Sequence, residues 1–205
     1  MRLGLFAVIH GDEPEGGLAL ARLAGALTAR PALATGYELT FYPLCNPTGL
    51  EDGTRFSRSG KDLNREFWIG SALPEVRLIE RELLTHRFDG LVALHTDDTA
   101  DGAYGFVRGK VLSAALLEPA LAAASRYVPR SQSSRIDGFE AERGIIYRGY
   151  EGILSAASGL RPEPFEIVFE TPGTLDRVRQ IQAAEAALLA IMERFREFIA
   201  FANGI

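Results

Sequence analysis

Hydrophobic residues recur along the chain at two spacings, which predict strands in some places and helices in others. Continuous apolar runs at 3–9, 91–94 and 167–169 predict buried strands, and a weaker run at 103–107 predicts another. Between 37 and 42, hydrophobic and polar positions alternate. That alternation is typical of a half-buried strand, so we expect this strand nearer the sheet edge than the first.

Apolar positions three or four residues apart predict helices over 15–29, 74–86, 112–127 and 175–201. Pro31 follows the first helix and Pro74 opens the second, because proline cannot continue a helix but fits its first turn. Strands and helices alternate along the chain. We therefore predict an α/β fold, a single-domain three-layer sandwich in which a mixed, largely parallel sheet is covered by helices on both faces.

Two segments lack a regular period. Residues 46–67 are rich in Gly, Asp, Asn, Arg and Ser and are too many for an ordinary connection, so we predict a functional loop there. Residues 129–165 contain many glycines and prolines and are expected to form loops around short strands.

The composition narrows the class of protein. The 205 residues, 47% hydrophobic and 24% charged, are expected to form one globular domain over 1–205. A net charge of −5 argues against a nucleic-acid partner, which requires a basic surface. We expect no membrane partner, because no apolar run is long enough for a membrane span or signal peptide. The single Cys45 favours a reducing compartment, and we expect the cytoplasm.

Several predicted strands end in side chains that can bind metal or carry protons. His10 and Glu13 follow the first strand, His95 follows the third, and Glu170 follows the last. The alternative for the first pair is a polar turn with an acid at the N-terminus of the next helix. The remaining histidine, His86, lies in the last turn of a predicted helix, where a histidine is favourable without any function.

Two histidines and one glutamate form a known catalytic zinc pattern. Such a ligand set leaves one position of a tetrahedral Zn²⁺ for water, so we predict one zinc ion held by His10, Glu13 and His95. Glu170 is the candidate general base that takes a proton from that water and passes it to a leaving amine. Its alternative role is a carboxylate that caps the turn after its strand.

At this point the sequence resembles the zinc carboxypeptidase family in its broad sense, including the succinylglutamate desuccinylase and aspartoacylase branch. The matching motifs occur in family order across nearly the whole chain: H-x-x-E at 10–13, N-P-x-G at 46–49, T-R at 54–55, D-L-N-R at 62–65, L-H-T at 94–96 and F-E-T-P at 169–172. The sequence D-L-N-R after N-P-x-G is the most specific of these signals.

The resemblance implies a role for each matching residue. Asn64 and Arg65 would bind a free carboxylate of the substrate, for which the planar guanidinium is suited. Arg55 would stabilise the oxyanion, with Arg58 as the competing candidate. The alternative for these arginines is a solvated loop face. A mobile tyrosine that contacts substrate would be either Tyr147 or Tyr150.

Two departures from the family pattern affect the interpretation. Many members of the desuccinylase branch have Asp two residues before the third zinc ligand, where this chain has Ala93. A second carboxylate partner for the metal site is therefore either absent or supplied by Asp97 or Asp98. The chain also ends one helix after Glu170, so we expect no additional C-terminal β-domain.

We therefore predict a zinc-dependent hydrolase that cleaves an amide bond next to a free carboxylate, in a peptide or in a small N-acyl amino acid. A further cation in the pocket, such as Arg135, Arg143 or Arg148, would favour an acidic side chain or acyl group. The alternative is a zinc-binding or ligand-binding protein that retains the fold without catalysis.

Overall fold

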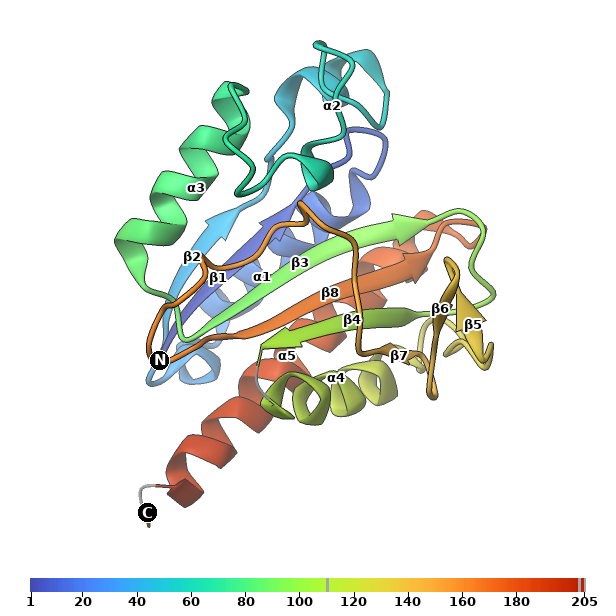
Figure 1. Ribbon diagram of the computed structural model, residues 1–205. Coiled ribbons are helices and arrows are strands. Elements are labelled where there is room, and N and C mark those ends of the chain that lie inside the picture. The colour runs from blue at the N-terminus through green and yellow to red at the C-terminus, as the bar shows by residue number, and fades with distance from the viewer. Residues whose placement is uncertain (110, 203, 205) are drawn as a thin grey trace.

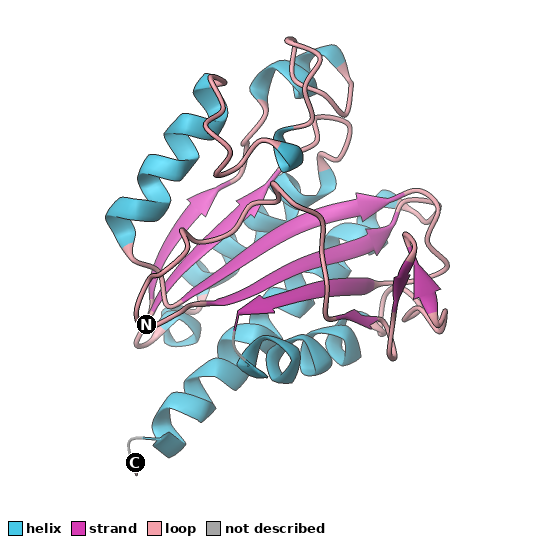
Figure 2. Cartoon of the chain, viewed as in Figure 1, coloured by secondary structure: helices cyan, strands magenta, loops and turns pink. Residues whose placement is uncertain are grey.

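The computed structural model describes residues 1–109, 111–202 and 204, and a six-stranded sheet forms the middle layer of this described part (Figures 1 and 2). The order is β2-β1-β3-β8-β4-β7, in which β4 runs antiparallel to β8 and the pairs among β2, β1, β3 and β8 are parallel. The strands are β1 (Arg2–Ala7), β2 (Glu38–Tyr42), β3 (Gly90–Asp97), β4 (Tyr104–Gly109), β7 (Ile145–Ile146) and β8 (Phe165–Pro172). The predicted mixed, largely parallel sheet is confirmed, and β2 lies at its edge as expected.

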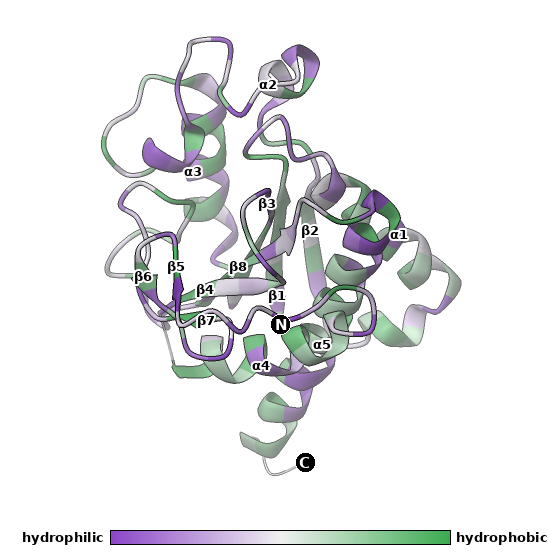
Figure 3. Ribbon diagram, turned by 90° about the vertical axis from the view of Figure 1, so that its right-hand side faces the viewer, coloured by the Kyte–Doolittle hydropathy of each residue, from purple (hydrophilic) through white to green (hydrophobic). Residues whose placement is uncertain are grey.

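One face of the sheet is covered by α1 (Glu15–Ala29), α4 (Val111–Ala124) and α5 (Arg177–Ala202). Leu20, Leu117 and Leu188 pack with strand residues in one buried apolar cluster. Helix α4 is hydrophobic around most of its circumference (Figure 3), because it packs against both the sheet and α5. It ends at Ala124, three residues earlier than predicted.

The other face is covered by α3 (Pro74–His86) and by residues 147–164, which we call the crossing segment. In Figure 1 this segment is orange and crosses in front of β4, β8 and β3. Val76, Ile79 and Leu83 of α3 pack in the same apolar cluster as Leu154 of the crossing segment. Helices thus cover both faces as predicted, with help from a segment without regular secondary structure.

The predicted functional loop 46–67 contains two short helices, which its lack of a regular period did not indicate. They are α2 (Pro47–Asp52) and the 3₁₀ helix η2 (Leu63–Arg65), and another 3₁₀ helix, η1 (Pro31–Ala34), follows α1. Asn46 accepts a hydrogen bond from Gly49 N (2.9 Å), and Pro47 occupies the first turn, which together start α2. Six residues are too few to display a helical period.

The connections place a crevice between β1 and β3. After β1 the chain passes through α1 to β2 on one side, whereas β3 lies on the other side of β1. Segments that leave the carboxyl ends of two such strands diverge, and ligands bind at this point in open α/β sheets. In the described part of the chain, no helix has the length and apolar character needed to cross a membrane.

Candidate metal centre and substrate pocket

The turn after β1 brings two potential ligands into the crevice. Val8 has a φ of 54°, a left-handed conformation that is unusual for a β-branched residue and redirects the chain at the end of the strand. Gly11 then packs on Gly49, because a Cβ at Gly11 would lie 2.0 Å from the carbonyl carbon of Gly49. The H-x-x-E and N-P-x-G motifs are therefore in direct contact through their glycines.

His10, Glu13 and His95 converge in the buried crevice. Nδ1 of His10 lies 2.5 Å from Glu13 Oε1, Nδ1 of His95 lies 2.8 Å from Glu13 Oε2, and the two Nδ1 atoms are 3.2 Å apart. One ligand atom from each residue lies within 4.8 Å of the others. Two imidazole nitrogens and a carboxylate that face one point are a donor set that fits a divalent metal such as zinc.

Interactions within the cluster shift the pKa values of Glu13 and His10. Burial alone would raise the pKa of Glu13, but the charge of His95 and hydrogen bonds with both histidines outweigh it and lower the pKa to about 2. Burial alone would lower the pKa of His10, but hydrogen bonds to Asp62 and Glu13 outweigh this effect, so the pKa of His10 is raised. Glu13 is thus held in its anionic form, as metal ligation requires.

Asp62 is the carboxylate that supports the cluster, so the expectation that such a partner is either absent or supplied by Asp97 or Asp98 was wrong. Its Oδ1 lies 3.2 Å from His10 Nε2 and accepts a hydrogen bond from Asn64 N (2.8 Å). A carboxylate on the far nitrogen of a ligating histidine fixes the ring and its tautomer. Asp97 instead accepts a hydrogen bond from the Tyr104 hydroxyl (2.8 Å). The first residue of D-L-N-R was the signal that could have identified Asp62.

The structure separates the two candidate oxyanion donors. Arg55 donates to Asp62 (3.1 Å), and its Nη1 lies 3.6 Å from Glu13 Oε1, so its guanidinium lies beside the cluster. Arg58 is exposed and pairs with Glu51 and Asp52. Arg55 therefore lies at the pocket, whereas Arg58 belongs to the outer face of the loop.

Asn64 and Arg65 occupy η2 directly above the crevice. The Asn64 side chain accepts a hydrogen bond from Leu154 N (2.9 Å), and its Nδ2 lies 3.3 Å from His95 Nε2. The Arg65 guanidinium stacks over the Tyr150 ring, with Cζ 4.1 Å from the centroid, and donates to Asn64 O (2.7 Å).

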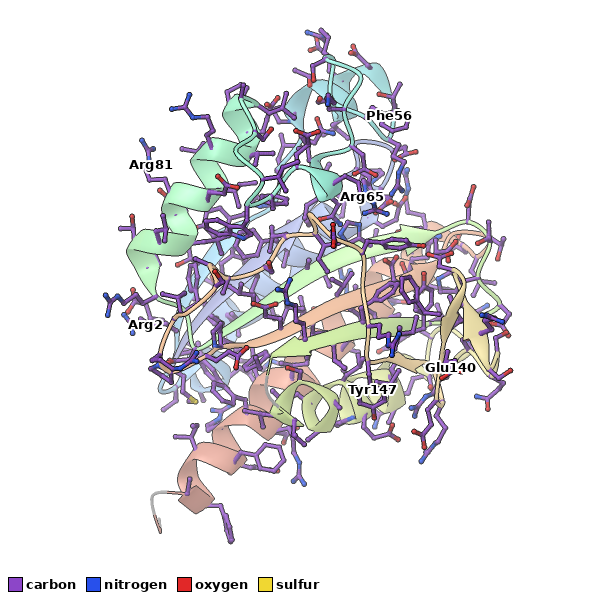
Figure 4. All side chains as sticks on the ribbon, viewed as in Figure 1. Arg2, Phe56, Arg65, Arg81, Glu140 and Tyr147 are labelled. Atoms are coloured by element: carbon purple, nitrogen blue, oxygen red, sulfur yellow. The ribbon has the colours of Figure 1, made fainter. Side chains whose placement is uncertain are left out.

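The two candidate tyrosines lie in different places. Tyr150 lines the crevice beside Arg65, and its hydroxyl donates to Asp137 O (3.2 Å). Tyr147 is 59% exposed, and Figure 4 places its side chain well away from Arg65.

Glu170 lies opposite His95 in the register between β8 and β3. Burial, together with the nearby charges of Glu13 and Asp97, outweighs the attraction of His95 and raises the pKa of Glu170 to about 8. A cation bound at the histidines would act in the opposite direction and favour the carboxylate. Both Glu170 and His95 lie within the last residues of their strands, which extend past the predicted ends.

A pocket of about 310 Å³ is lined by His10, Glu13, Arg55, Asn64, Arg65, Tyr150 and Glu170, and His95 contacts the lining residues Glu13 and Asn64. Sequence reasoning missed some of its wall, which includes Tyr104 and Asp137, the latter between the short strands β5 (Arg135–Ile136) and β6 (Phe139–Glu140). Of the cations considered for acidic substrates, Arg135 bonds to Gly138 O and Arg143 pairs with Glu118, both at exposed positions outside this pocket.

The crossing segment is fastened to η2 and the residues after it. Phe67 N donates to Gly152 O (3.2 Å), and the Trp68 indole donates to Ser155 O (2.8 Å). Gly152 has a φ of 75°, and a Cβ there would lie 2.4 Å from the carbonyl carbon of Arg65. Only glycine fits this approach without movement of the backbone.

Comparison with known proteins gives a family match over most of the site. The family model described as the succinylglutamate desuccinylase/aspartoacylase catalytic domain matches residues 1–131, which include the His10, Glu13 and His95 cluster. No curated protein sequence matches the chain.

Solved structures share the fold. A candidate metallopeptidase from Shewanella denitrificans has a TM-score of 0.78 at 26% identity, covering 95% of this chain and 75% of that one. A metallo-carboxypeptidase from Pseudomonas aeruginosa, in complex with (2-guanidinoethylmercapto)succinic acid, has a TM-score of 0.72 at 18% identity, covering 96% and 58%. A product-bound ectoine utilization protein from Ruegeria pomeroyi has a TM-score of 0.65 at 21% identity, covering 94% and 56%. The last two show likeness of fold alone.

We predict that Gly152→Ala loosens the crossing segment, because its Cβ collides with the backbone of Arg65. Amide hydrogen exchange at Leu154 and Phe67 should accelerate about tenfold or more, as expected when a local contact opens more easily. Gly159→Ala is the matched control, since Gly159 also has positive φ (83°) but its Cβ meets open space within the described residues. Equal exchange in both variants would contradict the docking role of Gly152.

Proposed function

The chain belongs to the succinylglutamate desuccinylase/aspartoacylase catalytic-domain family, and from this membership we propose that it is a zinc-dependent hydrolase acting on an amide bond next to a free carboxylate. One observation carries the proposal: His10 and Glu13, Glu170 and the cations Arg55 and Arg65 line one pocket, and His95 adjoins it through its 2.8 Å contact with Glu13. The bond is a C-terminal peptide bond or the bond of an N-acyl amino acid. The single, buried Cys45 supports the cytoplasm as the proposed location.

The ligands of structural neighbours support a carboxylate-bearing substrate. The Pseudomonas aeruginosa metallo-carboxypeptidase binds a substituted succinic acid. In this chain Arg65 lines the pocket and can offer its guanidinium to such a group, and stacking on Tyr150 orients the plane of the fork. Asn64 accepts from Leu154 N through Oδ1, and its Nδ2 lies beside His95 Nε2. Because the Nδ2 group carries two hydrogens, Asn64 can hold η2 in place and also donate a hydrogen bond to the carboxylate.

In the proposed mechanism His10, Glu13 and His95 hold one zinc ion, and Asp62 keeps the His10 ring in the orientation that presents Nδ1. When bound, zinc supplies Lewis acidity that polarises the scissile carbonyl and makes water more acidic. Glu170 takes a proton from the attacking water and returns it to the departing nitrogen. Arg55 stabilises negative charge that develops on the carbonyl oxygen, since a fixed cation acts more strongly on the transition state than on the neutral substrate.

If His10, Glu13 and His95 bind zinc, substitution of a ligand should reduce zinc binding more than substitution of the residue that supports a ligand. His95→Ala should abolish stoichiometric zinc, whereas Asp62→Asn should weaken zinc affinity by about 10–100-fold, the usual cost of losing a partner of a ligating histidine. Elemental analysis after dialysis and competition with a chelator measure the two effects. Asp52→Asn, at an exposed carboxylate of the same loop that pairs with Arg58, is the control. Unchanged zinc content in His95→Ala would place the metal elsewhere.

Glu170→Gln should fold and bind zinc normally while its kcat falls by on the order of a hundredfold or more, the range for a positioned acid–base group. Gln retains size and hydrogen bonding but cannot carry the proton. Glu163→Gln, an exposed change just before the opposite end of β8, should leave kcat unaltered. Near-normal turnover of Glu170→Gln would indicate that the general base is instead Asp97 or Asp98. If the zinc-loaded parent hydrolyses no acyl-amino acid or peptide, a non-catalytic binding protein becomes the better interpretation.

Arg65→Lys retains the positive charge but loses the fork that can bind both carboxylate oxygens. We expect kcat/KM on free-acid substrates to fall about tenfold or more, with a much smaller change on the matching C-terminal amides. Arg58→Lys, at an exposed arginine outside the pocket, serves as control. Equal losses on acids and amides would remove Arg65 from carboxylate recognition.

A further inference from the structure

A second cavity adjoins the metal pocket and is larger than it. It encloses about 810 Å³, against about 310 Å³ for the metal pocket, and lies between the crossing segment and the face of β3, β8 and β4. The two cavities meet at side chains that line both: Phe106, Gly149, Tyr150, Ile153 and Val168.

Apolar side chains form most of the wall of the larger cavity. Leu91 and Ala93 of β3 and Val168 of β8 are buried at its floor. Phe139 and Tyr150 meet edge to face, with centroids 4.9 Å apart, and close the side toward β6. Such a surface binds apolar groups, because they lose contact with water when they enter it.

The charged groups of this cavity are engaged with one another or exposed at its edge. Glu166 accepts a hydrogen bond from Ala156 N (2.8 Å) through Oε1, while its Oε2 is buried 3.9 Å from Arg108 Nε. Arg148, one of the cations considered above for acidic substrates, lines this cavity but is exposed, as is the acid Glu151 in the same segment. Among lining residues that the structure describes, none presents a buried, unpaired cation to a second carboxylate of a substrate.

We infer that the substrate residue bearing the free carboxylate has a bulky apolar side chain, and that this side chain occupies the larger cavity. The inference rests on the proposed function, since it takes Arg65 as the carboxylate-binding residue. Arg65 stacks on Tyr150, and Tyr150 lines both cavities. Atoms attached next to the carboxylate therefore lie at the junction, from which an aromatic or long aliphatic group can enter the larger cavity.

The first test compares N-acetyl and glycyl derivatives of phenylalanine, alanine and glutamate as free acids. With the zinc-loaded protein, kcat/KM for the phenylalanine compounds should exceed that for the alanine compounds by about tenfold or more, the usual effect of filling an apolar pocket. The glutamate compounds should be no better than the alanine compounds. A preference for glutamate, or equal rates for phenylalanine and alanine, would overturn the inference.

Gly149→Leu tests the junction. A Cβ at Gly149 lies 3.3 Å from the flexible end of Ile153, and φ is not positive there, so the backbone accepts a side chain. The ratio of phenylalanine to alanine kcat/KM should fall by about fivefold or more, because the added leucine obstructs the passage. Gly25→Leu, on an exposed turn of α1 with open space around it in the described structure, should leave the ratio unchanged. An unchanged ratio in Gly149→Leu would contradict the inference.

Direct binding separates failure of this inference from failure of the proposed function. Calorimetry with 3-phenylpropionate, propionate and glutarate should show the phenyl compound binding about tenfold or more tightly than the others, and Gly149→Leu should remove that advantage. This pattern without hydrolysis of any substrate would support the cavity assignment and refute the enzyme. Hydrolysis with equal binding of the three probes would support the enzyme and refute the cavity assignment.

Discussion

The site depends on one buried carboxylate that joins two strands. Glu13 lies between the rings of His10 and His95, and its Oε2 also accepts the backbone N–H of Thr96 (3.1 Å). An uncompensated buried charge costs about 3–5 kcal/mol, so these partners must remain in place for the native structure to persist. The turn after β1 and the end of β3 are thereby fixed relative to each other by the same atoms that can bind metal.

The polar loop after β2 supports this arrangement from outside. The Asn46 side chain donates to Ile9 O (3.2 Å) in the ligand-bearing turn and accepts from Gly49 N, while Gly49 packs on Gly11. Farther along the loop, Asp62 reaches the His10 ring. Buried polar groups that satisfy one another in this way order a segment that has little apolar surface to bury.

The fold and the convergence of His10, Glu13 and His95 could be predicted from the sequence for one physical reason. Parallel strands bring their carboxyl ends to one edge, so a residue that follows one hydrophobic run is close to residues that follow the neighbouring runs. His10 and His95, 85 positions apart, meet in this way. The same reasoning could not identify Asp62, which lies in a loop 52 positions from His10. The loop has no hydrophobic periodicity that would indicate where its side chains point. Proximity in sequence pointed instead to Asp97, which bonds to Tyr104.

The position of the crossing segment over the sheet could not be predicted from the sequence either, and the reason concerns how the pocket wall is attached. Its attachments use mainly backbone atoms, such as Gly152 O and Ser155 O, and leave no side-chain pattern in the sequence. Side chains at 149, 150 and 153 can therefore differ without loss of these bonds, whereas Gly152 cannot. This wall of the two cavities is thus free to vary while His10, Glu13 and His95 stay fixed. Arg65 joins the two parts, because its backbone packs on Gly152 and its guanidinium on Tyr150, so a displaced crossing segment would also displace the Arg65 guanidinium.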